Sequence, residues 1–445
     1  MKLFGTDGIR GTAGLPPLEP ATVARVGAAL ARTCPSVADG PLRVLIGRDT
    51  RESGVWIEQE LARGLASAGA AAVSAGIVPT PGVAYLTRAQ GFDLGVVISA
   101  SHNPYADNGI KAFSRSGEKI GETIEAAVER LVADPSWSVP ARGDVSVEHI
   151  DPAHAYGDHL RHILASAGPL TGSSIVVDCA NGATAAMAPA LFRSLGFDVI
   201  AIGVEPDGRN INLDCGSTHL TRLSAEVIAR GARLGIAFDG DGDRALFVDH
   251  HGRTVDGDAI LLIAAAYLKQ EGKLPGSAIV ATVMSNIGLE IALRERGIAL
   301  ARCPVGDKFV MEEMAARGLV LGGEQSGHVI FADHLSTGDG MATALHILKI
   351  LAARGGELSD LAAPMVPYPQ VLLNVRVREK ADYMQVPAIA AAVRRVEAAL
   401  DGQGRLLVRY SGTEPLLRIM LEGRHQDTIR AWADEIAGAV REHLT

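Results

Sequence analysis

The chain carries three aspartates at alternate positions: Asp239, Asp241 and Asp243. Alternate residues of an extended chain point the same way, so these carboxylates are expected to converge. Clustered carboxylates repel one another unless a cation joins them, and oxygen ligands favour Mg²⁺ over softer metals. An EF-hand does not fit, because Arg244 and His250 stand where that loop requires glycine and glutamate. The stretch predicts a magnesium site, with an acidic turn in solvent as the alternative.

A second candidate is the loop ISASHNPYADNGIK (98–111), which brings a hydroxyl, an imidazole and an amine together as Ser101, His102 and Lys111. An acyl-transfer serine would be expected in a G-x-S-x-G elbow, which the sequence lacks. A histidine next to the serine in sequence is no evidence of a base, since such pairs are assembled in space. Taken alone, the loop also fits a polar turn capped by serine and asparagine.

A third loop, GGEQSGH (322–328), follows a strand-like segment and is bounded by glycines. Glu324 and Ser326 are suited to hydrogen bonding of neighbouring sugar hydroxyls. His328 could exchange a proton near neutral pH, although a lone histidine is more often structural.

A fourth loop, RYSGTEP (409–415), is followed by Arg418. Its hydroxyls, its glycine backbone and two arginines form a plausible phosphate cradle. It is not a Walker A loop, because no G-K-[ST] occurs in the chain. A hairpin turn with solvated arginines is the alternative.

The elements that must position these loops alternate between helix and strand. Helical spacing at 22–33 and 55–69 flanks a short buried strand at 43–49, and 173–203 reads as strand, helix, strand. This pattern predicts βαβ units with mainly parallel sheets, whereas the end of the chain predicts an α+β module after a proline-rich linker. We expect α/β domains at 1–152, 153–254 and 255–366, and an α+β domain at 367–445.

Composition narrows the class of protein. The 445 residues are 47% apolar and carry a net charge of -9 without a lysine or arginine tract, so nucleic acid is not an expected partner. The apolar run at 259–268 is too short to cross a bilayer, and no signal peptide is expected. Four separated cysteines suit a reducing cytoplasm.

Motifs from the four loops occur in a fixed order with others between them: FGTDGIRG, SASHNP, DNGIKAF, FDGDGDRALFVD, ATVMSNIGLE, VGDKFV, GGEQSGH, TGDG and SGTEPLLRIM. Over essentially its whole length the chain resembles the α-D-phosphohexomutase superfamily. Lys308 and Tyr410 depart from the arginine and proline that the family usually has there. The resemblance implies four domains around a central cleft, with one loop from each. Such enzymes are often homodimers, but the sequence shows no interface.

The resemblance also implies a role for each loop. Ser101 would be a phosphoserine whose phosphate binds Mg²⁺ together with Asp239, Asp241 and Asp243. The reacting phosphate would be lined by Arg10, His102 and Lys111. The sugar would be held by Glu324, Ser326 and His328, with Arg244 and Lys308 as further substrate-binding residues. The phosphate that does not react would be held by Arg409, Ser411, Gly412, Thr413 and Arg418.

The implied reaction interconverts glucosamine 6-phosphate and glucosamine 1-phosphate, which feeds UDP-N-acetylglucosamine and peptidoglycan synthesis. Phosphorylated Ser101 would give its phosphoryl group to the free sugar hydroxyl, and the 1,6-bisphosphate would turn over and return its other phosphate. Lys111 and His102 are expected to move the protons, with His328 as an alternative. Two other interpretations stay open: a phosphomannomutase/phosphoglucomutase, and a non-catalytic sugar-phosphate sensor.

Overall fold

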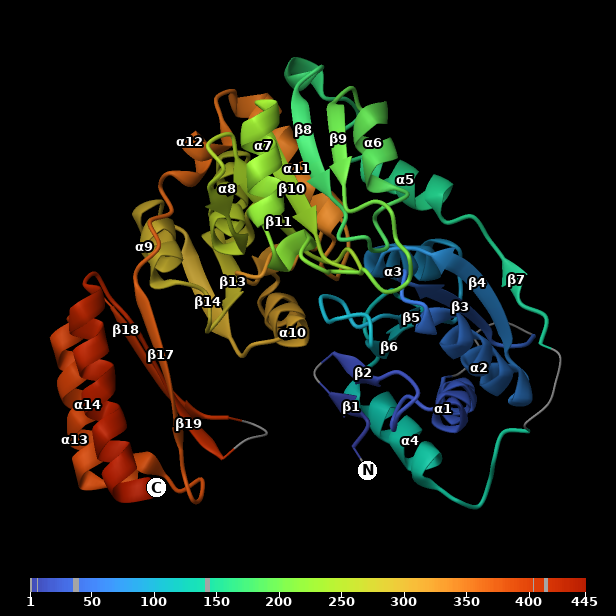
Figure 1. The fold of residues 1–445 in the computed structure, drawn as a ribbon, viewed down its shortest axis with the longest axis horizontal. Coiled ribbons are helices and arrows are strands. Elements are labelled where there is room, and N and C mark those ends of the chain that lie inside the picture. The colour runs from blue at the N-terminus through green and yellow to red at the C-terminus, as the bar shows by residue number, and fades with distance from the viewer. Residues whose placement is uncertain (1, 6, 35–39, 141–144, 403, 412–414) are drawn as a thin grey trace. The chain divides into compact units, whose positions relative to one another are not determined.

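The computed structural model describes residues 2–5, 7–34, 40–140, 145–402, 404–411 and 415–445. The chain divides into two compact units. The first comprises Met1–Met284 and Gly297–Pro364, and the second comprises Ser285–Arg296 and Met365–Thr445. Three sheets lie in the first unit and one in the second (Figure 1).

The first sheet is mixed and has the strand order β1-β2-β6-β5-β3-β4-β7. Its central strands β3, β4 and β5 run parallel, and β5 turns back into antiparallel β6. The serine loop is the connection between β5 and β6. The strands are β1 (Phe4–Gly5), β2 (Gly8–Thr12), β3 (Arg43–Arg48), β4 (Ala71–Ile77), β5 (Leu94–Ile98), β6 (Asp107–Ser114) and β7 (Glu148–His149).

Helices of this first domain are α1 (Pro20–Thr33), α2 (Ser53–Ser67), α3 (Thr80–Ala89) and α4 (Glu122–Ala133). Small residues let α1 and α2 approach closely. A Cβ atom at Gly64 would lie only 1.9 Å from the carbonyl oxygen of Ala24. The abundance of alanine and glycine therefore serves close packing of helix on helix, over a core of branched apolar residues from the sheet.

The second sheet has the order β12-β11-β10-β8-β9, with β8, β9 and β10 parallel. Its strands are β8 (Ser174–Asp178), β9 (Asp198–Ile202), β10 (Leu234–Phe238), β11 (Ala245–Asp249) and β12 (Thr254–Val255). The helices are α5 (Ala153–Arg161), α6 (Ala188–Ser194) and α7 (Thr221–Arg230). Strands β10 and β11 form an antiparallel hairpin, and the acidic loop is its turn.

The third sheet has the order β14-β13-β15-β16, and the glycine-bounded loop is the turn from β15 to β16. Its strands are β13 (Ala278–Thr282), β14 (Ala299–Cys303), β15 (Leu321–Gly323) and β16 (Val329–Phe331). The helices of this part of the first unit are α8 (Gly257–Gln270), α10 (Asp307–Arg317), α11 (Gly340–Arg354) and α12 (Leu358–Ala362).

The second unit is an antiparallel sheet in the order β17-β19-β18, with α13 and α14 packed against it (Figure 1). Its strands are β17 (Gln370–Arg376), β18 (Arg405–Tyr410) and β19 (Leu416–Glu422), and its long helices are α13 (Pro387–Leu400) and α14 (Gln426–Leu444). Helix α9 (Ile287–Glu295) groups with this unit, because Asn286 bonds the backbone of Tyr368.

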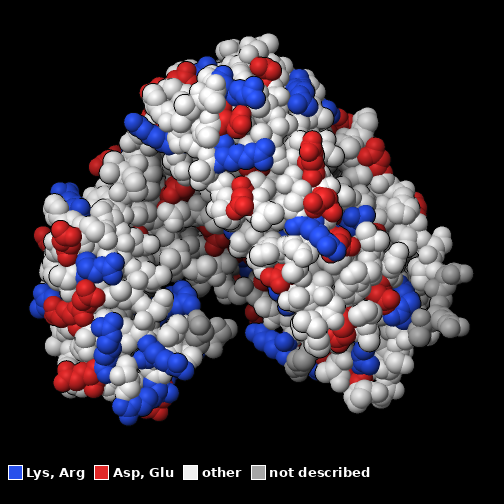
Figure 2. All heavy atoms as spheres, viewed as in Figure 1, with Lys and Arg blue, Asp and Glu red and all other residues white. Residues whose placement is uncertain are grey.

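These elements confirm the predicted fold class, with three α/β domains followed by a C-terminal α+β domain. Figure 2 shows basic and acidic side chains interspersed over the face in view. Among the described helices, none has both the length and the apolar character needed to cross a membrane.

Candidate active site

Ser101 lies at the turn between β5 and β6, and its backbone adopts the left-handed conformation with φ of 52°. A serine rarely adopts this conformation, so the surrounding structure must hold it there. Its hydroxyl is buried and donates a 2.5 Å hydrogen bond to Asp239 Oδ2. His102 Nδ1 lies 3.4 Å from the same hydroxyl oxygen.

Arg51 holds the serine loop in place through hydrogen bonds to its backbone. Its guanidinium group is fully buried and donates to the carbonyl oxygens of Ser101 at 3.0 Å, Asn103 at 2.8 Å and Asp107 at 3.0 Å, and to that of Pro104. Five fixed donors on one planar group suit this role.

Three further side chains complete the support of this loop. Asp49 pairs with Arg51 at 2.9 Å and accepts from the Ser99 hydroxyl, which in turn accepts from the Ser101 N–H group. From the connection between β9 and α7, the Asn212 amide donates to the carbonyl oxygens of Ser101 and Asn103 at 2.9 and 3.1 Å.

The three aspartates of the acidic loop converge as the sequence predicts. One carboxylate oxygen from each of Asp239, Asp241 and Asp243 lies within 4.8 Å of the others, and all three side chains are buried. Asp241 Oδ1 and Asp243 Oδ1 are buried without a hydrogen-bond partner among the described residues. Burial, and then Asp243 and Asp241, raise the pKa of Asp239. Buried, unsatisfied carboxylate oxygens at this spacing fit a hard divalent cation.

Lys111 on β6 connects this cluster to the first sheet. Its buried Nζ lies 3.1 Å from Asp241 Oδ2, 3.1 Å from Asp7 Oδ2 and 3.6 Å from Asp243 Oδ2. Burial alone would lower the pKa of Lys111, but these carboxylates raise it, so the amine is an ammonium ion. Thr80, the first residue of α3, donates to Asp241 Oδ2 at 2.7 Å.

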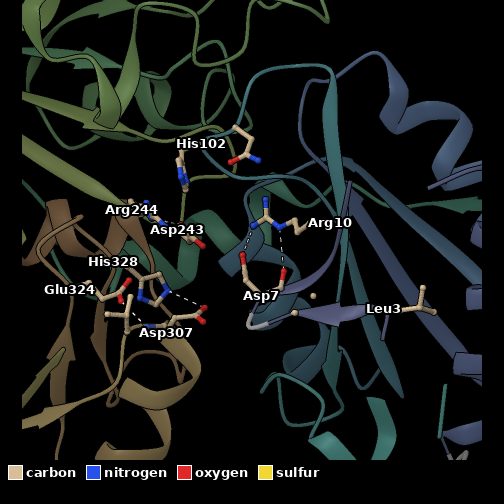
Figure 3. Close-up of a pocket in the computed structure, with 14 residues that line it drawn as sticks. Leu3, Asp7, Arg10, His102, Asp243, Arg244, Asp307, Glu324 and His328 are labelled. Carbon is tan, nitrogen blue, oxygen red and sulfur yellow. Dashed lines mark hydrogen bonds and ion pairs between the residues drawn. The ribbon is translucent and has the colours of Figure 1, made fainter. Parts of the chain in front are cut away.

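A cavity of about 430 Å³ opens beside this cluster (Figure 3). One wall carries Arg10, whose guanidinium group contacts Asp7. The other carries Glu324, His328 and Asp307, and both ring nitrogens of His328 are buried without a hydrogen-bond partner among the described residues. The ring nitrogens of His328 are therefore open to a bound ligand.

His102, Asp243 and Arg244 form the end of the cavity that adjoins Ser101. The pKa of His102 is lowered by loss of solvent around the ring and then by Arg244 and Arg10. The Arg244 guanidinium group lies 3.8 Å from Asp243. A neutral imidazole next to two guanidinium groups can accept a proton beside an anionic ligand.

Two of the predicted substrate residues lie elsewhere. Lys308 on α10 does not line this cavity, and its ammonium group pairs with Glu122 at 2.8 Å. Ser326 is in the turn after β15, and its hydroxyl is buried without a partner among the described residues. Neither residue lines the cavity: the Ser326 hydroxyl is buried in the turn, and Lys308 is engaged in an ion pair between α10 and α4.

The predicted phosphate cradle belongs to the second unit. Arg409 on β18 stands directly opposite Arg418 on β19 in the antiparallel register, and Arg418 donates to the Ser411 hydroxyl at 3.3 Å. Gly412 and Thr413 lie outside the described residues. Like charges opposite one another destabilise a sheet, so this pair suits an anion that binds both guanidinium groups.

Sequence reasoning missed several residues at the site: Asp7, Asp49, Arg51, Thr80, Lys119, Asn212 and Asp307. Lys119 joins the turn between β1 and β2 to the start of α10, with its ammonium group 2.7 Å from Asp7 Oδ1 and also paired with Asp307. The sequence did offer a signal for Asp7 and Asp307. They lie in the segments FGTDGIRG and VGDKFV, where the aspartate follows a threonine and a glycine, respectively.

Family models match most of the chain. Residues 1–138, 154–252 and 256–368 match the three α/β/α domains of phosphoglucomutase/phosphomannomutase, and residues 372–439 match its C-terminal domain. Taken with the fold and the site, these matches show that the chain belongs to the phosphoglucomutase/phosphomannomutase family, the phosphohexomutases.

Within that family, similar relatives are the phosphoglucosamine mutases of Solibacter usitatus and Moorella thermoacetica. The chain is 49% identical to each, over 99% and 96% of both sequences respectively. A solved phosphoglucomutase/phosphomannomutase family protein of Burkholderia thailandensis has a TM-score of 0.80 at 26% identity, covering 99% of this chain and 97% of that one. The chain therefore groups with the phosphoglucosamine mutases and is an isomerase.

Proposed function

We propose that this enzyme interconverts glucosamine 6-phosphate and glucosamine 1-phosphate through a phosphoserine at Ser101. The observation that carries the proposal is the contact of the Ser101 hydroxyl with Asp239, inside a cluster of three buried carboxylates and beside a cavity. A serine hydrolase needs no such acidic cluster, whereas phosphoryl transfer needs charge neutralisation and positioning above all. The names of the relatives supply the amino sugar.

The metal in the proposal is Mg²⁺, held by Asp239, Asp241 and Asp243 together with the phosphate on Ser101. The Asp241 and Asp243 carboxylate oxygens that are buried without a partner in the described part of the chain support this assignment. When bound, Mg²⁺ supplies positive charge that offsets the charge of the transferring phosphoryl group.

The protein's own residues transfer the protons and neutralise charge. The sugar oxygen forms the new bond to phosphorus as the bond to Ser101 Oγ breaks, and the sugar hydroxyl loses its proton while the serine oxygen regains one. We assign the proton transfers to His102, whose Nδ1 lies 3.4 Å from Ser101 Oγ. Three carboxylates keep Lys111 protonated. Its ammonium group therefore neutralises negative charge and donates hydrogen bonds, and it does not act as a base. Arg10 adds charge from the facing wall.

Substrate binding completes the proposed site. Glu324, Ser326 and His328 hold the sugar, Arg244 and Lys308 add positive charge, and the distal phosphate is bound by Arg409, Ser411, Gly412, Thr413 and Arg418. The sugar 1,6-bisphosphate is the intermediate, and added bisphosphate activates enzyme that has lost its phosphate. Domains at 1–152, 153–254, 255–366 and 367–445 each supply one loop.

The proposal also covers the cellular location and the assembly of the enzyme. All four cysteines are buried free thiols, which suits the cytoplasm. A homodimer is the proposed assembly, and light scattering on the purified enzyme would give its mass directly.

The test is a comparison of kcat/KM for glucosamine, glucose and mannose 6-phosphates. The proposal expects the highest value for the glucosamine substrate. A preference for glucose or mannose phosphate would favour a phosphomannomutase/phosphoglucomutase, and binding of phosphosugar without turnover would favour a sensor.

A further inference from the structure

The cavity beside Ser101 is lined by more negative than positive side chains. Two guanidinium groups face it, against four carboxylates: Asp7, Asp243, Asp307 and Glu324. A site that took only a neutral sugar bearing phosphate would gain from the opposite balance, because every carboxylate repels the phosphate. The excess of carboxylates suits a ligand that carries a positive charge of its own.

Three of these carboxylates already have another role or several cationic partners. Asp243 belongs to the acidic cluster, and Glu324 is proposed to bind sugar hydroxyls. Asp7 is engaged by Arg10, by Lys111 at 3.1 Å and by Lys119 at 2.7 Å. Asp307 has one cationic partner, Lys119, against three at Asp7, and its other contacts are with the Lys308 N–H group at 2.7 Å and with His328 Nε2 at 3.8 Å.

Asp307 lies next to the proposed sugar-binding residue on the same wall. The N–H group of Gly306 donates to Glu324 Oε1 at 3.1 Å, and Asp307 is the next residue in the chain and begins α10. Figure 3 shows Asp307, Glu324 and His328 together on this wall, facing Arg10 and Asp7. A sugar with a hydroxyl bound to Glu324 therefore presents its adjacent ring substituents towards Asp307.

We infer that Asp307 binds the C2 ammonium group of the amino sugar and so distinguishes it from glucose and mannose phosphates. This inference rests on the proposed function and names its specificity-determining residue. The C2 carbon is bonded to the carbon that carries one of the hydroxyls assigned to Glu324. A carboxylate makes a charge-assisted hydrogen bond to an ammonium group there, and only a weaker one to a hydroxyl.

The test compares glucosamine 6-phosphate with glucose 6-phosphate in the wild type and in Asp307→Asn. For the variant we expect kcat/KM to fall about 10- to 100-fold with the amino sugar and much less with glucose, so that the preference collapses. Asp307→Glu keeps the charge and should retain part of the preference. An equal fall for both substrates would overturn the inference.

Lys119→Met is the matched control, because it breaks the same ion pair and leaves the Asp307 carboxylate in place. It should preserve the preference, even where overall activity falls. A loss as large as that of Asp307→Asn would assign the effect to the ion pair and overturn the inference.

A second measurement needs no variant. In the wild type the preference for the amino sugar should decline as the pH rises through the pKa of the sugar amine, because only the ammonium form carries charge. A preference that is unchanged across this range would also overturn the inference. A wild type without any preference would instead contradict the proposed function, so the two failures are distinguishable.

Discussion

Ser101 and Asp239 are 138 positions apart in sequence, yet the hydroxyl of one donates a 2.5 Å hydrogen bond to the carboxylate of the other. This contact joins the loop between β5 and β6 to the hairpin turn between β10 and β11. A phosphate on Ser101 would consequently lie against the three carboxylates, where only a cation makes the arrangement stable.

Metal removal should therefore silence the enzyme. We expect a chelator to abolish turnover, and added Mg²⁺ to restore activity and to raise the melting temperature by binding the folded state alone. Asp243→Asn should weaken Mg²⁺ binding in calorimetry by at least about tenfold, because it removes one charged ligand. Asp158→Asn, at an exposed carboxylate on α5, is the control. Full activity in chelator would count against the metal site.

Arg51→Met should destabilise the fold as well as the site. It leaves Asp49 buried without its partner and frees four carbonyl groups of the serine loop. Breaking a buried pair of this kind costs about 3–5 kcal/mol, measurable by urea unfolding. Arg161→Met removes an exposed ion pair on α5 and should cost less than about 1 kcal/mol. Equal effects of the two substitutions would show that Arg51 is not the support of the loop.

Arg418→Gln should raise KM by about 10- to 100-fold with a smaller effect on kcat, since it removes a charged hydrogen bond to the distal phosphate. It should also relieve the like-charge pair with Arg409. Arg395→Gln is the matched control, because Arg395 pairs with Glu435 on the surface of the same unit. An unchanged KM for Arg418→Gln would remove the phosphate-binding role.

His346 on α11 should make the fold sensitive to acid. It stacks on Phe331 with ring centroids 3.9 Å apart, and burial, then His334 and Lys349, lower its pKa to about 3. The unfolded chain binds a proton near pH 6.5 and the folded chain does not, so stability is complete above pH 6.5 and falls between pH 6.5 and 3.

Urea unfolding at pH 7 and pH 5 would measure this loss, which should be about 2 kcal/mol from His346 alone. In His346→Leu the difference between the two pH values should shrink by that amount. The same difference in both proteins would contradict the assignment to His346.

Sequence predicted those parts of the site that are local in the chain. The spacing of Asp239, Asp241 and Asp243 depends on one turn, and the alternation of an extended chain is enough to make their carboxylates converge. The same holds for the fold class, since helical and strand periodicities are local patterns.

The residues that hold the loops in place could not be found in this way. Arg51 reaches residues 50 or more positions away, and Asn212 reaches the serine loop from the connection between β9 and α7. Sequence alone does not distinguish a buried arginine or asparagine from an exposed one, because the surroundings of the side chain depend on the fold. Likewise, the ion pair between Lys119 and Asp307 could not be predicted, because it depends on the position of α10 beside the first sheet.

The most direct test is to locate the phosphate that the enzyme carries. After incubation with glucosamine 1,6-bisphosphate, intact mass and peptide mapping should show one added phosphoryl group, on the peptide that contains Ser101. Excess glucosamine 6-phosphate should remove it, and Ser101→Ala should neither carry the group nor turn over substrate. A phosphoryl group on another residue, or normal turnover by Ser101→Ala, would contradict the account.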